Sequence, residues 1–308
     1  MAERWRDVVA DGVRLRVREV DDAGRAAPTV MLLHGLASSQ RVWDLMLPRL
    51  ARRFRVVTYD ARGHGLSAKP SSGYGFGTMT GDALAVIRAV GRRRPLVVGH
   101  SWGAMVALEL AVRHPRSIGG TVLVDGGVAP VGAGRPWPEV RDALAPPRLA
   151  GMHVDRFREL IPTFWGGAVP ITPAIEEIVL AVMHVGRDGT IRPRLSRANH
   201  LRILRSIWEQ DPVALHAQLR VPTLAILARG PDDAGEAGSG KRVAAAAIRA
   251  SGAPTRIAWM RAIHDVPLQH PDALARRIER VAEGIERPDG DGSNASAAVR
   301  SNAPRRPR

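Results

Sequence analysis

Residues 95–103, PLVVGHSWG, contain the pattern that decides the fold. Their first part, PLVV, predicts a short strand buried on both faces, and Trp102–Arg113 continues as an apolar segment of helix length. Gly99 and Gly103 flank Ser101 in a Gly-x-Ser-x-Gly arrangement. A sharp strand-to-helix turn strains its central residue, and a glycine on either side lets strand and helix approach closely. The pattern therefore predicts a nucleophile elbow that exposes the Ser101 hydroxyl at the carboxyl end of a sheet.

The rest of the chain repeats this alternation of short apolar runs and helix-length segments. The opening residues, turning at Asp11-Gly12, read as a hairpin. The buried strands are expected at Thr29–Leu33, Arg55–Tyr59, Thr121–Val124, Thr223–Leu227 and Arg256–Trp259, and the helices at Gln40–Ala51, Thr78–Val90, Glu236–Ser251 and Pro271–Glu286. The alternation predicts an α/β fold with a mostly parallel, twisted sheet and helices on both faces.

One stretch interrupts the alternation. Residues 128–219 are rich in proline and in short helical patterns, and they contain no clear buried strand. Their tryptophans and phenylalanines favour a packed helical cap over a disordered insertion. We expect an α/β core at 1–127 and 220–286, the cap between these parts, and a disordered tail at 287–308.

The positive charge of the chain indicates no particular partner. The formal net charge is +15, but Lys69 and Lys241 are the only lysines, so the charge is almost entirely arginine. The arginines are scattered, and few aromatic residues accompany them to stack on bases. An arginine-rich codon usage explains this composition, and we expect a small-molecule substrate and no nucleic acid. The oligomeric state is not predicted.

Composition also excludes several kinds of site. The chain has no cysteine, which rules out disulfides, thiolate catalysis and cysteine metal sites. There is no His-Glu-x-x-His motif, and we expect neither a metal nor another cofactor. No apolar run is long enough to cross a membrane, and the first residues lack the apolar core of a signal peptide. A cytoplasmic protein is the expectation.

A second loop carries the other half of an acyl-transfer site. His34-Gly35-Leu36 directly follows the expected strand Thr29–Leu33. Acyl transfer needs two backbone N–H groups aimed at the developing oxyanion. Trp102, next after Ser101, would supply one and Leu36 the other. Because the donors are backbone groups, the His34 side chain is expected only to order its loop.

Together these motifs make the chain resemble the α/β-hydrolase superfamily over roughly residues 3–286. The shared pattern adds residues 60–67, DARGHGLS, which match the family's D-x-R-G-x-G-x-S loop, and a late histidine. In the family the D-x-R-G-x-G-x-S loop is structural. The resemblance implies that His264 is the general base, since it follows the last strand and precedes the final helix. His270 is the local rival, but its neighbour Pro271 fits the start of that helix.

The resemblance leaves the third triad member open. A buried carboxylate must fix the tautomer of the base and stabilise its imidazolium. Most of the superfamily places it in the turn that here contains Asp232 and Asp233, although the spacing of this turn departs from the usual pattern by about one residue. Some relatives with a cap place it where this chain has Asp125, which could instead only cap the Gly126-Gly127 turn. We rank Asp232 slightly ahead of Asp125, with Asp233 third.

The resulting prediction is a cofactor-free serine hydrolase acting on an ester-like small molecule. Ser101 would form an acyl-enzyme, with Leu36 and Trp102 holding the oxyanion. The resemblance also allows a C–C bond hydrolase or lyase on the same triad, or a receptor that binds a small molecule without turnover. Haloalkane dehalogenases and epoxide hydrolases are disfavoured because they carry aspartate where this chain has Ser101. Proline iminopeptidases are disfavoured because residues 35–39, GLASS, lack their Gly-Gly-Pro-Gly-like loop.

Overall fold

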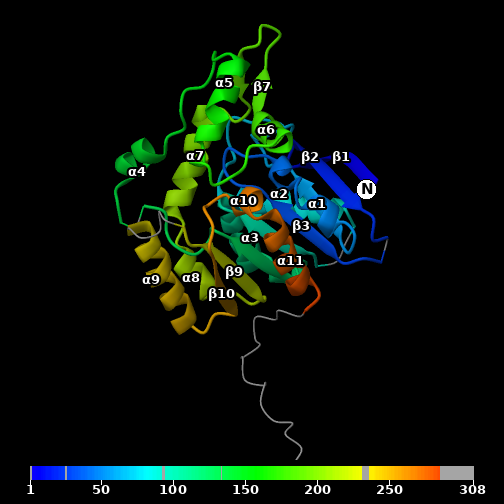
Figure 1. Ribbon diagram of the computed structural model, residues 1–308. Coiled ribbons are helices and arrows are strands. Elements are labelled where there is room, and N and C mark those ends of the chain that lie inside the picture. Colours follow the sequence, from blue (N-terminus) through cyan, green and yellow to red (C-terminus); the bar gives the residue numbers. More distant parts are fainter. Residues whose placement is uncertain (1, 25, 92–93, 133, 231–235, 285–308) are drawn as a thin grey trace, which may run out of the picture.

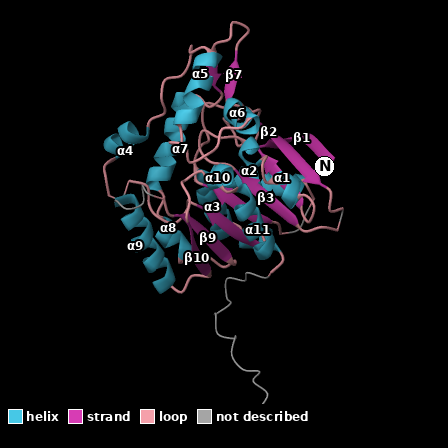
Figure 2. Cartoon of the chain, viewed as in Figure 1, coloured by secondary structure: helices cyan, strands magenta, loops and turns pink. Residues whose placement is uncertain are grey.

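The computed structural model describes residues 2–24, 26–91, 94–132, 134–230 and 236–284. Within these ranges one eight-stranded sheet forms the centre of the molecule, with helices on both sides (Figures 1 and 2). Its order is β1-β2-β4-β3-β5-β6-β9-β10, where β2 pairs antiparallel with β1 and β4 and all other pairs are parallel. The strands are β1 (Ala2–Ala10), β2 (Val13–Asp21), β3 (Thr29–Leu33), β4 (Arg55–Tyr59), β5 (Leu96–His100), β6 (Gly120–Val124), β9 (Thr223–Ala228) and β10 (Thr255–Met260).

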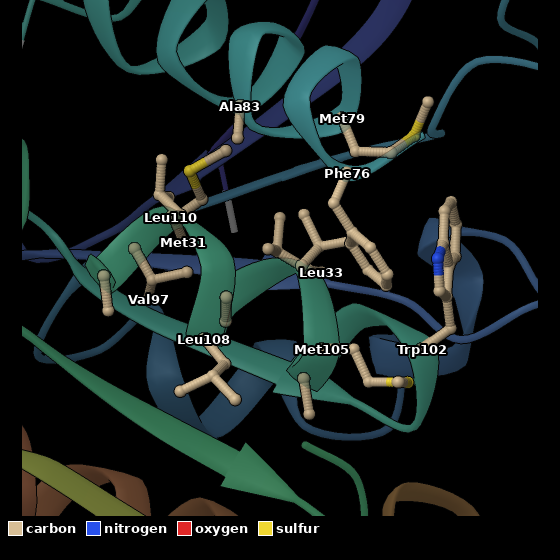
Figure 3. Packing of buried hydrophobic residues seen from close by; sticks show 14 of the residues in the cluster. Met31, Leu33, Phe76, Met79, Ala83, Val97, Trp102, Met105, Leu108 and Leu110 are labelled. Carbon is tan, nitrogen blue, oxygen red and sulfur yellow. The ribbon is translucent and has the colours of Figure 1, made fainter. Parts of the chain in front are cut away.

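The central strands are continuous apolar runs because both of their faces are covered. Successive side chains of a strand point to opposite faces, so Met31 and Leu33 join one core and Leu32 the other. Helices α2 (Phe76–Ala89), α3 (Trp102–Arg113) and α9 (Glu236–Ala250) contribute to the first core. Segments η1 (Gln40–Trp43), α1 (Leu47–Leu50), α10 (Val266–Gln269) and α11 (Pro271–Ala282) contribute to the second. Figure 3 shows the first core, where side chains of α2 and α3 meet those of β3.

Most element boundaries agree with the sequence-based expectation to within a few residues, and one helix differs. The single helix expected at Gln40–Ala51 is instead two short segments, η1 and α1. Pro48 lies in the first turn of α1, where its missing N–H costs nothing. A proline inside a continuous helix would remove a hydrogen bond and clash with the preceding turn. The chain therefore ends one helix and begins another.

The segment between β6 and β9 is a helical insertion that contains its own small core. Its elements are α4 (Trp137–Leu144), α5 (Val154–Leu160), η3 (Ile161–Thr163), α6 (Pro173–Leu180), β7 (Met183–Val185), β8 (Ile191–Pro193), α7 (Arg197–Glu209) and α8 (Pro212–His216). Strands β7 and β8 form a hairpin that the sequence did not reveal, because three-residue strands carry too few residues to show a pattern. Phe157, Ile161, Met183 and Ile191 pack together in this core. Figure 1 shows α5, α6 and β7 beyond one end of the sheet.

Side-chain contacts identify the end of the sheet that the insertion covers. The indole N–H of Trp165 donates to Asp265 at 2.8 Å, and the amide of Asn199 donates to the carbonyl of Pro70 at 3.0 Å. Asp265 and Pro70 both lie in loops that leave the carboxyl ends of parallel strands. The expected tail, 287–308, lies outside the described residues. No helix of the described part is long and apolar enough to cross a membrane.

Candidate active site

Ser101 occupies a strained turn between β5 and α3. Its φ of 55° and ψ of −120° are rarely adopted by a residue with a side chain. The turn is possible because its neighbours are glycines: a Cβ on Gly99 would lie 2.2 Å from the carbonyl oxygen of Gly103. A Cβ on Gly126 would lie 2.1 Å from the backbone carbonyl oxygen of Ser101. The strand, the turn and the loop after β6 are therefore packed too closely for any larger residue.

His264 faces this serine from the loop between β10 and α10. Its Nε2 lies 2.9 Å from the Ser101 hydroxyl oxygen, within reach for proton transfer. The loop is held by His100, whose Nε2 lies 2.9 Å from the carbonyl oxygen of His264. His270, the other histidine considered, is instead the residue that precedes the first turn of α11. The structure therefore places His264, and not His270, beside Ser101.

Asp125 completes the hydrogen-bonded chain. It follows β6 with a φ of 43°, and its Oδ2 lies 2.6 Å from Nδ1 of His264. Its Oδ1 accepts the backbone N–H of Ala228 at 2.9 Å and lies 3.0 Å from the ammonium of Lys241. Asp232 and Asp233, the other candidates for the acid, lie outside the described residues. Among the described carboxylates, Asp125 is the one bonded to His264.

The electrostatics of this chain favour an ionised acid and a readily protonated base. Burial opposes ionisation of Asp125, but hydrogen bonding and the charges of His264 and Lys241 outweigh it and lower the pKa of the carboxyl. For His264, burial acts to lower the pKa, but the Asp125 carboxylate outweighs it and the net shift is upward. Burial and the repulsion of His264 lower the pKa of His100 to about 4, so His100 is neutral near pH 7.

The loop after β3 and the start of α3 present free backbone donors. Neither the N–H of Leu36 nor that of Trp102 has an acceptor within the described part of the chain. Both residues line a cavity of about 750 Å³ together with Ser101 and His264. The Nδ1 atom of His34 lies 2.8 Å from the carbonyl oxygen of Gly35, so this ring orders the loop. His34 is not among the residues that line the cavity.

The loop that matches D-x-R-G-x-G-x-S makes contacts within the scaffold around the site. The carboxylate of Asp60 accepts the backbone N–H groups of Gln40 and Leu66 at 2.9 and 2.8 Å. The guanidinium of Arg62 forms a two-pronged pair with Asp82, and both side chains are buried. Every one of these contacts is internal to the scaffold, which agrees with the structural role expected for the loop.

Sequence reasoning missed two residues of the site, His100 and Lys241. His100 occupies a variable position of the elbow motif, and the motif does not reveal that its ring reaches the loop of His264. Lys241 lies on α9, 116 residues after the aspartate it contacts. The one available signal was its rarity, since it is one of two lysines in a chain rich in arginine.

Comparison with known proteins points to one superfamily. Residues 28–161 match a family model described as the alpha/beta hydrolase fold. The candidate carbamate hydrolase RutD of Klebsiella pneumoniae is 30% identical over 205 residues, which are 66% of this chain and 73% of that protein. The 2-(acetamidomethylene)succinate hydrolase of Mesorhizobium japonicum is 29% identical over 239 residues, which are 77% of this chain and 78% of that protein.

Solved structures resemble the fold over nearly the whole chain. The crystal structure of E-2-(acetamidomethylene)succinate hydrolase superposes with a TM-score of 0.73 and 22% identity, covering 92% of this chain and all of that one. A thioesterase domain from the curacin biosynthetic pathway gives a TM-score of 0.71 and 18% identity, covering 91% of this chain and all of that one. At these identities the likeness concerns the fold alone.

Proposed function

Because the chain belongs to the α/β-hydrolase superfamily, we propose that it is a serine hydrolase that cleaves an ester-like bond of a small molecule through an acyl-enzyme on Ser101. The observation that carries the proposal is the hydrogen-bonded chain from Ser101 through His264 to Asp125. Ser101 lines a cavity together with Leu36 and Trp102, the two residues whose backbone N–H groups are unused in the described part of the chain. Nucleophile, base and orienting acid in this geometry define the serine triad wherever it occurs. In this proposal the reaction needs no cofactor.

In the first step the Ser101 oxygen attacks the carbonyl carbon of the substrate while His264 takes the hydroxyl proton. The Asp125 carboxylate keeps the His264 proton on Nδ1, so Nε2 is free to accept the proton from the serine. The carbonyl oxygen becomes an anion, which the N–H groups of Leu36 and Trp102 stabilise. His264 then gives its proton to the leaving group as the bond to the carbonyl carbon breaks.

In the second step water takes the place of the leaving group. His264 removes a proton from the water, the resulting hydroxide attacks the acyl carbon, and the same two N–H groups hold the oxyanion again. The bond to Ser101 breaks, the serine recovers the proton from His264, and the acid is released. Residues 128–219 would act as a cap that closes the cavity over the reacting atoms and sets the substrate range.

A second candidate is cleavage of a bond other than an ester, such as an amide or a C–C bond, by the same residues. The observation that favours it is the likeness to the 2-(acetamidomethylene)succinate hydrolase, whose named substrate is not an ester. A nucleophilic serine and an oxyanion site serve either bond, so the identity of the leaving group decides between the candidates.

The test combines active-site labelling with turnover of p-nitrophenyl esters of increasing acyl length. The wild-type protein should react with a fluorophosphonate at Ser101, and Ser101→Ala should lose both labelling and turnover, the latter by several orders of magnitude. Ser72→Ala, which changes an exposed loop serine, is the matched control and should behave as wild type. Turnover close to wild type in Ser101→Ala would refute the proposal.

The labelling result also separates the candidates. If Ser101 is labelled and one ester length is hydrolysed well, ester cleavage is supported and the preferred length reports the depth of the cavity. If Ser101 is labelled but no ester is hydrolysed, the nucleophile is competent and the second candidate is favoured. Saturable binding of a small molecule with no product from any substrate class would instead indicate a receptor.

A further inference from the structure

A second cavity of about 990 Å³ lies between the insertion and the core. The insertion contributes residues 146–150, 182–184 and 192–197, and the core contributes the loops after β3 and β4. The lining contains five side chains that carry a positive charge at neutral pH and no carboxylate. These are Lys69, Arg148, Arg192, Arg194 and Arg197.

The positive charges of this cavity are not paired with carboxylates at contact distance in the described part of the chain. Within the described ranges, none of the five cations forms an ion pair with an aspartate or glutamate. The ammonium of Lys69 donates to the carbonyls of Gly65 and Ser67, and the guanidinium of Arg194 to that of Ala181. Backbone carbonyls orient these groups, and carboxylates act on the cluster only at longer range, Asp60 on Lys69 and Asp142 on Arg197.

Two of the five cations occupy electrostatically unfavourable positions. Burial and then the charge of Arg194 lower the pKa of Lys69; Asp60 opposes this shift, and Arg192 adds a smaller part to it. Arg197 is the first residue of α7, where the helix dipole disfavours a cation. Each placement sets like charges or like partial charges together. An anion in the cavity would relieve both.

The basic cavity adjoins the one that contains Ser101. His200 lines both cavities, and the consecutive residues Leu36 and Ala37 line the Ser101 cavity and the basic cavity, respectively. Burial, and secondarily the charge of Arg197, lowers the pKa of His200 to about 4, so its ring adds no charge near pH 7. One substrate could therefore place its reacting carbonyl at Ser101 and extend past His200 into the basic cavity.

We infer that the basic cavity is a subsite for an anionic group of the substrate, a carboxylate or a phosphate, carried on the part remote from the bond that is cleaved. This inference rests on the proposed function, since it assigns the substrate class of the same site. Arginine and lysine side chains converging on one space provide charge-assisted hydrogen bonds to either oxyanion. A neutral ester would fill the reaction site without using any of them.

Kinetics with charged and neutral ester pairs test the inference. Mono-p-nitrophenyl esters of succinate, glutarate and adipate carry a free carboxylate, and their methyl esters are the neutral partners. Wild type should have the higher kcat/KM for at least one free acid over its methyl ester. In Arg192→Gln/Arg197→Gln, both exposed side chains lose their charge, and kcat/KM for that acid should fall roughly tenfold or more while the neutral ester is unaffected.

The control variant is Arg116→Gln, which removes an exposed arginine near the start of β6, at the opposite end of the sheet. It should alter neither member of a pair. Because the carboxylate and the phosphate are two sources of the same charge, acetyl-coenzyme A is assayed in parallel. A selective loss on this thioester in the double variant would identify phosphate as the anion, and a selective loss on the free acids would identify carboxylate.

Binding to Ser101→Ala separates failure of this inference from failure of the proposed function. Adipate and pyrophosphate are titrated calorimetrically into Ser101→Ala with and without the two arginine substitutions, so no turnover is needed. Binding of either anion that is lost with the arginines supports the subsite even if no ester is hydrolysed. Equal kcat/KM for charged and neutral esters, together with no binding of either anion, would overturn it.

Discussion

Replacing Asp125 by asparagine should disable the triad through the wrong tautomer of His264. The N–H of Ala228 donates to Oδ1 of Asp125, and the ammonium of Lys241 lies 3.0 Å from Oδ1 and 3.3 Å from Oδ2. The amide oxygen of an asparagine will take the place of Oδ1, and its NH₂ group will face Nδ1 of His264, where the carboxylate oxygen lies at 2.6 Å. Two donors would then oppose each other unless the ring moves its proton to Nε2. In that tautomer Nε2 cannot accept the proton of Ser101.

The expected size of the effect is a fall in kcat of about 10⁴, the magnitude typical of this change in serine triads. It corresponds to about 5.5 kcal/mol of transition-state stabilisation. The assay is steady-state hydrolysis of the preferred p-nitrophenyl ester, with thermal unfolding to show that the fold persists. Asp232→Asn is the decisive comparison, because the sequence leaves both aspartates open. Near-normal kcat in Asp125→Asn together with a large loss in Asp232→Asn would refute the assignment.

Three further perturbations test the electrostatics and packing of the scaffold. Lys241→Met removes a charge that lowers the pKa of His264, so the pKa of His264 should rise. Because the neutral ring is the base, the acidic limb of the kcat/KM profile should then move to higher pH. An unchanged acidic limb would contradict an influence of Lys241 on His264. Gly99→Ala places a Cβ 2.2 Å from a backbone oxygen of α3 and should cost about 1–3 kcal/mol or more in urea unfolding, with loss of labelling at the elbow. Asp82→Asn leaves the guanidinium of Arg62 buried without its carboxylate and should lower the unfolding free energy by about 3 kcal/mol, which an unchanged urea midpoint would exclude.

The parts of the fold that were predictable from sequence are those fixed by local patterns. Strands β3 and β4 begin and end at the expected residues because each is a continuous apolar run buried on both faces. Helix α3 likewise matches Trp102–Arg113, since the glycine-flanked elbow fixes where it starts. The hairpin of β7 and β8 was not predicted, because its stability comes from packing within the insertion and not from a pattern of its own.

The position of the acid was not predictable for a related reason. The environment of Asp125 is assembled from three distant segments: the N–H of the last residue of β9, a lysine on α9, and His264 beyond β10. Each contact is a property of how strands β6, β9 and β10 lie side by side in the sheet. A spacing rule along the chain cannot contain that information, so the sequence leaves Asp232 and Asp125 both open, and the assignment to Asp125 is part of our proposal.

The insertion, residues 128–219, lies next to both Asp125 and the loop of His264. Asp125 is followed by Gly126-Gly127 and then by the first residue of the insertion, so only these two residues separate it from where the insertion begins. From the other side, Trp165 of the insertion donates to Asp265, the neighbour of the general base. The insertion therefore begins next to Asp125 and contacts the loop that carries His264, and we expect a change in its packing to alter the geometry of these residues as well as the shape of the cavity. Trp165→Phe tests this coupling, because it removes the N–H donor and keeps an aromatic ring, although a smaller one. We expect kcat to fall for every ester in the series by a similar factor, whereas a change confined to KM would show that the insertion shapes the cavity alone.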